Sequence, residues 1–191
     1  MNLMRLFVAI HLGNEVGARL ARELPALQQL APGARWVGAD SVHLTIAFLG
    51  HLPEEKVPSI EAAIDATAAE SAPLRLRATG LGGFGSVKHP HVLWVGLRGD
   101  VKSLENIKKA LEARLEPIGY QPEKRDFHPH LTLARAKAPR GDDLLAKCIQ
   151  KAGDAEFGEA RVDRLILFRS ELSPRGARHS PIFEAEFRGK A

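Results

Sequence analysis

Two stretches of the sequence, HLTI at residues 43–46 and HLTL at residues 130–133, repeat one pattern of histidine, leucine, threonine and an aliphatic residue. The chain contains only 8 histidines and four threonines. At this composition a histidine two positions before a threonine is expected about 0.2 times by chance, and two such pairs in about 1% of chains. The copies lie 87 residues apart. The repeat therefore indicates a relationship between the two halves of the chain.

The secondary structure expected from the sequence has a similar order in both halves. The expected elements are a strand at 5–10, a helix at about 14–30, a strand at 42–49, a helix from 53 to about 69, strands at 74–78 and 91–97, a helix at about 101–116, a strand at 130–134, a helix at about 141–152, and strands at 161–169 and 182–187. A shift of 87 residues brings most of these elements into coincidence, and it aligns the strand at His91 with Arg178. Pro25 should kink or shorten the first helix. The glycine-rich segment 80–85 is interpreted as a connection between strands, because it lacks the Gly-Lys-Ser/Thr ending of a phosphate-binding loop.

Length and composition predict one domain, residues 1–191, with two lobes. The chain has 191 residues and 45% hydrophobic content, which suits a single globular domain. The only cysteine, Cys148, is expected in the core, and no intrachain disulfide can form. No apolar run reaches about 18 residues, and the run at 6–10 is too short for a signal peptide. We expect a cytoplasmic monomer without membrane association. The net charge of +4 suits RNA or solubility equally well.

Strand geometry explains why histidine and threonine recur two positions apart. Residues i and i+2 of a strand project to the same face, about 6–7 Å apart. His43 therefore projects with Thr45, and His130 with Thr132, while the leucine between them packs on the opposite face. If a pseudo-twofold axis relates the halves, the two His/Thr pairs face each other across a cleft.

Two imidazoles and two hydroxyls suit displacement at phosphorus. A neutral imidazole accepts a proton from water and a protonated one donates to the leaving oxygen, since the ordinary pKa of histidine is about 6.5. Each threonine hydroxyl can donate to a non-bridging phosphate oxygen. No serine, cysteine or carboxylate adjoins either histidine, so we expect direct attack by water.

Two other interpretations of the histidines remain open at this point. They can be core residues of half-buried strands, or metal ligands, since His128 and His130 lie on one strand face. The nearest carboxylate, Asp126, precedes His128 by two positions and forms no obvious ligand pattern. We expect neither a metal ion nor another cofactor.

The sequence resembles the two-histidine phosphoesterases, and within them the RNA 2′,3′-cyclic phosphodiesterases once named 2′-5′ RNA ligases. The matching segments are RLFVAI at 5–10, WV at 36–37, HLTIAFLG at 43–50, VLWVG at 92–96, FHPHLTLAR at 127–135 and FRSEL at 168–172. The resemblance implies an α+β fold, bilobal and duplicated about a pseudo-twofold axis, with antiparallel sheets lining a central cleft and helices outside. It implies hydrolysis of RNA 2′,3′-cyclic phosphate ends to 2′-phosphates without metal or ATP.

The resemblance also implies residue roles. His43 would protonate the departing 3′ oxygen, His130 would activate water, and Thr45 and Thr132 would hold the phosphate. Three further residues are substrate-binding candidates: Arg135, Phe48 and His128. Strict alternation, however, places Arg135 opposite His130 and Phe48 with the core, where they would be ordinary surface and core residues. His179 stands where the family often has a tyrosine, so nucleobase preference can differ here.

Three alternative functions are compatible with the same set of residues. The chain could join or open 2′-5′ RNA linkages, or hydrolyse another small cyclic phosphate. It could also bind RNA ends without turnover.

Overall fold

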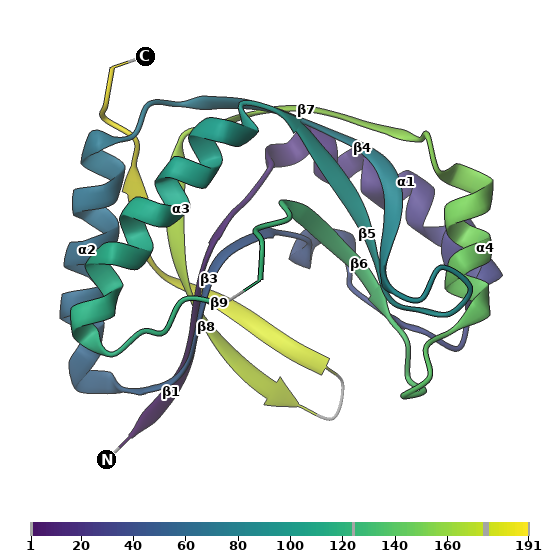
Figure 1. The fold of residues 1–191 in the computed structure, drawn as a ribbon, viewed down its shortest axis with the longest axis horizontal. Helices are drawn as coiled ribbons and strands as arrows, with labels where there is room; N and C mark the ends of the chain where they lie inside the picture. Colours follow the sequence, from purple (N-terminus) through teal and green to yellow (C-terminus); the bar gives the residue numbers. More distant parts are fainter. Residues whose placement is uncertain (1, 124, 174–175, 191) are drawn as a thin grey trace.

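The computed structural model describes residues 2–123, 125–173 and 176–190. Its elements are β1 (Leu3–Ile10), α1 (Gly13–Leu30), β2 (Arg35–Trp36), η1 (Ala39–Ser41), β3 (Leu44–Pro53), η2 (Glu54–Lys56), α2 (Val57–Glu70), β4 (Leu74–Gly85), β5 (Pro90–Gly99), α3 (Val101–Leu115), η3 (Glu116–Ile118), β6 (His130–Arg135), α4 (Asp143–Ala152), β7 (Glu156–Val162), β8 (Arg164–Ser173) and β9 (Gly176–Glu186). Figure 1 shows helices on the outside and the strands between them. The α+β class expected from the sequence is confirmed.

The strands form one antiparallel sheet made of two wings. Within the described residues the order is β7-β4-β5-β6-β3-β1-β8-β9, with β2 paired to β6. At the centre, β3 and β6 meet through the pair Leu44–Leu131. We name the strands β3, β1, β8 and β9 the β1 wing, and the strands β6, β5, β4 and β7 the β5 wing. By position in the sheet, β3 corresponds to β6 and β1 to β5. The counterpart of β5 in the sheet is thus β1. The shift of 87 residues had instead aligned the strand at His91 with Arg178, which lies in β9.

Each wing carries its own pair of helices. Helices α2 and α3 pack against each other, and α2 contacts β8 and β9 of the β1 wing. Helices α1 and α4 pack together and contact β7, β4 and β5 of the β5 wing, on the right of Figure 1. Because α1 follows β1 in the chain yet covers the β5 wing, the two wings are not the two halves of the sequence. Among the described residues, no helix is both long and apolar enough to cross a bilayer.

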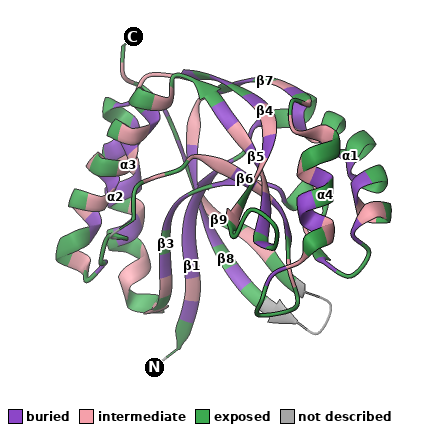
Figure 2. Ribbon diagram, turned by 45° about the vertical axis from the view of Figure 1, so that its right-hand side comes forward, coloured by how far each residue is buried: buried purple, intermediate pink, exposed green. Residues whose placement is uncertain are grey.

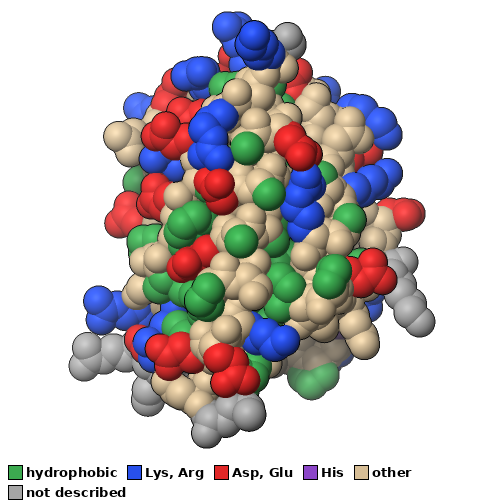
Figure 3. Space-filling view, turned by 90° about the vertical axis from the view of Figure 1, so that its left-hand side faces the viewer, with side chains coloured by type: hydrophobic (Ala, Val, Ile, Leu, Met, Phe, Trp, Pro, Cys, Tyr) green, Lys and Arg blue, Asp and Glu red, His purple; other side chains and the backbone are tan. Residues whose placement is uncertain are grey.

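The main core lies between the sheet and these helices. Helix α1 buries Val16, Leu20, Leu24 and Leu27, at the spacing of one helical face. Figure 2 shows buried positions along β1 and β3 and on the helix faces turned toward the sheet. Each fully buried leucine contributes about 1.5–3 kcal/mol. Cys148 of α4 is buried in this core, as expected. Figure 3 shows cations and anions interspersed on the outer face of α2 and α3, without a surface of one sign.

Helix α1 reaches Leu30 as expected and is not shortened at Pro25, which lies inside it between the buried Leu24 and Leu27. Other local expectations were wrong. The glycine-rich segment 80–85 is the second half of β4 and not a connection. A Cβ on Gly82 would lie 2.1 Å from the Trp94 ring, so glycine permits the indole to lie against the strand. Strand β7 had not been expected, and the strand expected at 161–169 is divided between β7 and β8.

Candidate active site

The central strand pair brings both His/Thr motifs together. Leu44 and Leu131 are antiparallel partners and are both buried beneath the site. The same register sets His43 across from Thr132, and Thr45 across from His130. Side chains directly opposite each other on neighbouring strands have Cβ atoms about 4.5–5.5 Å apart. All four side chains line one cavity of about 280 Å³, which is the convergence expected from the motif spacing.

The two imidazoles are oriented in the same way. Nδ1 of His43 lies 2.8 Å from the carbonyl oxygen of Ser41, and Nδ1 of His130 lies 2.6 Å from that of His128. A carbonyl only accepts, so each Nδ1 carries the proton and donates it. In the neutral ring Nε2 then has the free lone pair. Each histidine therefore presents Nε2 as the nitrogen that can exchange a proton with a ligand.

Burial keeps both histidines uncharged near pH 7. The pKa of His43 is lowered to about 4, chiefly by desolvation; the hydrogen bond to the Ser41 carbonyl opposes this shift, and the nearby His179 and His11 add to it. The pKa of His130 is also lowered, chiefly by burial and also by the nearby Arg135. An anion bound between the two rings would raise both pKa values by favouring the charged forms.

Aromatic side chains fix the two rings differently. His43 stacks on Phe7, with ring centres 4.9 Å apart, and has His179 edge-on at 5.5 Å. His130 instead meets Phe84 edge-on at 4.8 Å. Phe7 belongs to a small second core cluster, with Ala9, Ile166 and Phe168, on the cleft side of the β1 wing. The imidazole of His43 thus rests on an apolar floor, which accounts for its strong desolvation.

Phe48 and Arg135 lie on the cleft face, contrary to strict alternation. Strand β3 has a register shift where it pairs with Val8 and Ala9, and β6 has one where it pairs with Leu93 and Trp94. Each shift leaves two consecutive residues buried, Ile46-Ala47 and Leu133-Ala134. A β-bulge of this kind moves the following residue to the other face. Phe48 is accordingly 43% exposed, and it lines the cavity together with Arg135.

The placement of Phe48 in the core was therefore wrong, and Arg135 is beside the motif residues rather than opposite His130. Both bulges follow the motif histidine by the same number of residues. Phe48 and Arg135 consequently occupy equivalent positions in the two motif strands, 87 residues apart. Sequence alternation alone contains no signal for an extra residue in a strand.

His128 lies just before β6 and beside the motif histidine His130. Its side chain is exposed and lines a neighbouring cavity of about 540 Å³, which shares Thr45, Phe48, His130, Thr132 and Arg135 with the first. Its carbonyl oxygen is the acceptor that orients His130. Among the described residues, no three His, Cys, Asp or Glu side chains are grouped closely enough to hold a metal ion.

Sequence reasoning did not assign several residues that line the motif cavity. These are Arg5 and Phe7 of β1 and Ser170 of β8, whereas His179 of β9, which the sequence analysis had linked to nucleobase preference, also lines the cavity. The signal for Arg5 was a charged residue inside an otherwise apolar strand. The strand at 168–172 gave no signal for Ser170, because its neighbours in the sheet were unknown.

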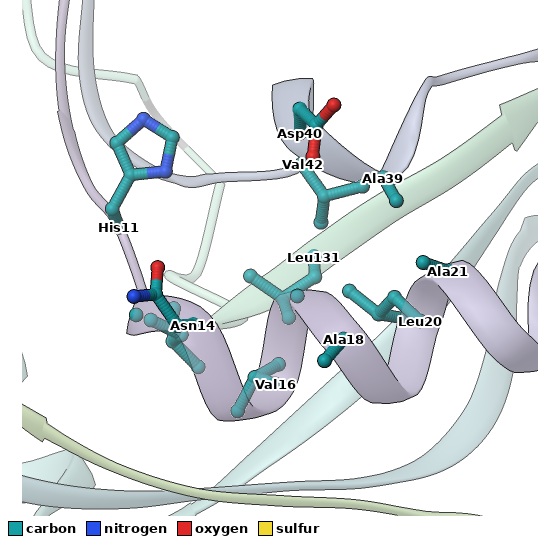
Figure 4. A pocket seen from close by; sticks show the side chains of 13 residues that line it. His11, Asn14, Val16, Ala18, Leu20, Ala21, Ala39, Asp40, Val42 and Leu131 are labelled. Atoms are coloured by element: carbon teal, nitrogen blue, oxygen red, sulfur yellow. The ribbon is translucent and has the colours of Figure 1, made fainter.

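A further cavity of about 430 Å³ lies away from the motif imidazoles, between α1 and η1. Figure 4 shows His11 and Asn14 at one end and Asp40 above the helix, with aliphatic side chains between them. It contains Leu131 but neither motif histidine. The candidate site is therefore the cavity that holds both His/Thr pairs.

Curated relatives resemble the chain over most of its length. An RNA 2′,3′-cyclic phosphodiesterase of Aeropyrum pernix is 32% identical over 168 residues, covering 88% of this chain and 94% of the relative. One of Thermus thermophilus is 32% identical over 194 residues, covering 98% of this chain and 92% of the relative.

Solved structures and a family profile agree with this similarity. The crystal structure of TT0787 of Thermus thermophilus superposes with a TM-score of 0.81 at 31% identity, covering 98% of this chain and 100% of that one. Escherichia coli LigT complexed with 3′-AMP shares the fold, with a TM-score of 0.75 at 23% identity and coverage of 97% and 99%. The 2′-5′ RNA ligase superfamily profile matches residues 16–174. The chain belongs to the 2′-5′ RNA ligase superfamily.

Proposed function

We propose that this chain is an RNA 2′,3′-cyclic 3′-phosphodiesterase, which opens a cyclic phosphate end to a 2′-phosphate. The observation that carries the proposal is the Leu44–Leu131 pair, because it sets two His/Thr pairs around one cavity. The names of the curated relatives support the same reaction. The substrate class is RNA with a 2′,3′-cyclic phosphate end.

The reaction is an in-line displacement by water. Neutral His130 accepts a proton at Nε2 from the attacking water, and the new P–O bond forms. The P–O3′ bond breaks, and His43 donates a proton from Nε2 to the departing oxygen. We assign these roles by the family resemblance. The low pKa of His43 requires the phosphate anion to favour its protonated form, since the pKa is about 4 in the protein alone.

The hydroxyls and Arg135 stabilise the phosphate. Thr45 and Thr132 each donate a hydrogen bond to a non-bridging oxygen, where charge develops in the transition state. Arg135 is beside His130 and supplies a cation to the same phosphate. Two imidazoles provide both proton transfers, so the proposed reaction needs no metal ion or ATP. The exposed ring of Phe48 offers a stacking surface for a base.

A product assay on a short RNA ending in a 2′,3′-cyclic phosphate tests the proposal. The assay contains EDTA, omits ATP, and includes His43→Ala and His130→Ala beside the native protein. We expect a 2′-phosphate from the native protein only. Inhibition by EDTA would contradict the metal-free reaction, and salt-sensitive binding without any product would favour an RNA-end binding module.

One observation favours a second candidate, the joining or opening of 2′-5′ linkages. The two cavities share five residues and extend on both sides of the motif, so the cleft has room for groups on both sides of a phosphate. A 5′-hydroxyl RNA added to the same assay distinguishes the two, because only joining yields a longer RNA. The monomeric state and cytoplasmic location stay predictions.

A further inference from the structure

Three polar side chains form a row across the β1 wing, beside the motif. Arg5 of β1 donates from Nη1 to Oγ of Ser170 on β8 over 3.4 Å. Ser170 is in turn the register partner of His179 on β9. All three line the 280 Å³ cavity that contains the His/Thr pairs. The hydrolysis proposed above uses none of them.

The charge around this row is positive. Two arginines, Arg5 and Arg135, line the motif cavity together with three histidines whose pKa values are lowered by burial, and none of the described residues lining it is Asp or Glu. The larger cavity on the other side of the motif contains Glu123 and Asp126 beside Arg125. Its lysine, Lys108, is already paired with Glu112. An anion is therefore favoured more strongly on the side of Arg5, where no carboxylate among the described residues opposes the arginines, than on the opposite side.

Some of the polar atoms in this row have no hydrogen-bond partner among the described residues. The Arg5 guanidinium lies over the Phe48 ring, 4.9 Å from its centre, and its hydrogen bonding within the described residues is confined to Ser170. Nδ1 of His179 is buried and makes no hydrogen bond within the described part of the chain. A buried polar atom without a partner is unfavourable. Oxygens of a bound anion would occupy the unused donors of the Arg5 guanidinium.

The spacing along β1 relates this row to the reacting phosphate. Arg5 precedes Phe7 by two residues, which places them on one face about 6–7 Å apart. Phe7 is the ring on which His43 stacks. Arg5 is therefore separated by about 6–7 Å from the ring that supports the catalytic imidazole. This separation is comparable with the distance between successive phosphates of a nucleotide chain.

We propose that Arg5, Ser170 and His179 form a second anion subsite, which binds the phosphodiester joining the terminal nucleotide of the RNA to the preceding one. This inference rests on the proposed function. It deepens the substrate assignment, because such a subsite selects an RNA strand over a nucleoside 2′,3′-cyclic phosphate. Arg5 contributes most, because guanidinium binds phosphate oxygens through two donors.

The test compares two dinucleotides that both end in a 2′,3′-cyclic phosphate. One has an ordinary phosphodiester between its nucleosides, and the other a neutral methylphosphonate of nearly the same shape. We expect the native protein to turn over the charged dinucleotide with a kcat/KM at least tenfold higher. In Arg5→Gln this ratio should fall below threefold, whereas Arg161→Gln, on the far edge strand β7, should keep the native ratio. Rising salt should lower the native ratio.

Each outcome separates the two proposals. Equal kcat/KM for both dinucleotides in the native protein overturns the subsite and leaves the hydrolase assignment standing. An equal loss on both dinucleotides in Arg5→Gln also overturns it, because the residue then acts without sensing the upstream charge. If neither dinucleotide is hydrolysed by folded native protein, the proposed function fails and the subsite with it. Ser170→Ala should lower the ratio of the two kcat/KM values by a smaller factor than Arg5→Gln. The ratio of the native protein is measured without any variant, so misfolding of Arg5→Gln would not prevent the test.

Discussion

The two motif strands, β3 directly after His43 and β6 beginning at His130, share a backbone arrangement and differ in their surroundings. Both histidines donate from Nδ1 to the carbonyl two residues earlier, and both strands have a bulge after the threonine. His43 lies on the rings of the β1 wing beside another histidine, whereas His130 lies near Arg135 and Phe84. The two strands thus present the same groups through a similar backbone, and we propose that their different neighbours give the two imidazoles different roles.

The largest expected effect comes from removing either imidazole. His43→Ala and His130→Ala should each lower kcat on a cyclic phosphate by about 10²–10⁴-fold, the usual contribution of a general acid or base. Rapid-quench or steady-state product assays measure the loss.

An aryl phosphodiester then tests whether the two roles differ. Its p-nitrophenolate leaves without being protonated, so His43→Ala should retain far more of the native rate on this substrate than on the cyclic phosphate. His130→Ala should lose activity on both. The opposite pattern would show that His130 is the proton donor and His43 the proton acceptor. Equal losses of activity in both variants would contradict the assignment of different roles to the two histidines.

The threonines provide the next effect. Thr45→Val and Thr132→Val preserve side-chain shape and remove one donor each, so kcat should fall about 10²-fold in both, near the lower value for one oxyanion donor. Thr79→Val is a matched control in β4, because Thr79 bonds Glu156 outside the cavity. A loss confined to one threonine would show that the phosphate is held by one strand alone.

Substitutions of Phe48 and Arg135 should have smaller effects, and these effects should depend differently on the terminal base of the RNA. Arg135→Gln should raise KM about 10–100-fold, the range of about 1.5–3 kcal/mol for hydrogen bonds to a charged group. Phe48→Ala should raise KM about tenfold, as expected for the loss of base stacking. An RNA whose terminal nucleotide is abasic separates them. The effect of Arg135→Gln should persist on it, and the effect of Phe48→Ala should disappear.

The α+β class and the pairing of each histidine with its threonine on one face could be predicted from sequence, because both depend on short-range periodicity. Alternation puts His43 with Thr45, and it puts the leucine between them in the core. Phe48 could not be placed, since one extra residue in a strand reverses every later position and leaves no mark in the sequence. Ser170 and His179 could not be assigned to a row with Arg5, because the order β1-β8-β9 depends on long-range pairing. Strand β7 was missed because its short alternating run is interrupted by Gly158.

The smallest expected effect is on stability, and it distinguishes the two histidines without substrate. The pKa of His43 is about 4 in the folded protein and about 6.5 when unfolded, so between these values the unfolded chain binds more protons. Stability contributed by neutral His43 is therefore complete above pH 6.5 and is lost as pH falls toward 4. Urea unfolding at pH 8 and pH 5 should show a fall in unfolding free energy about 2 kcal/mol larger for the native protein than for His43→Gln. His130→Gln should show a difference of the same sign and smaller size, because His130 is less buried. A larger difference between the native protein and His130→Gln than between the native protein and His43→Gln would contradict this prediction. It would show that His130, and not His43, is the more strongly desolvated imidazole.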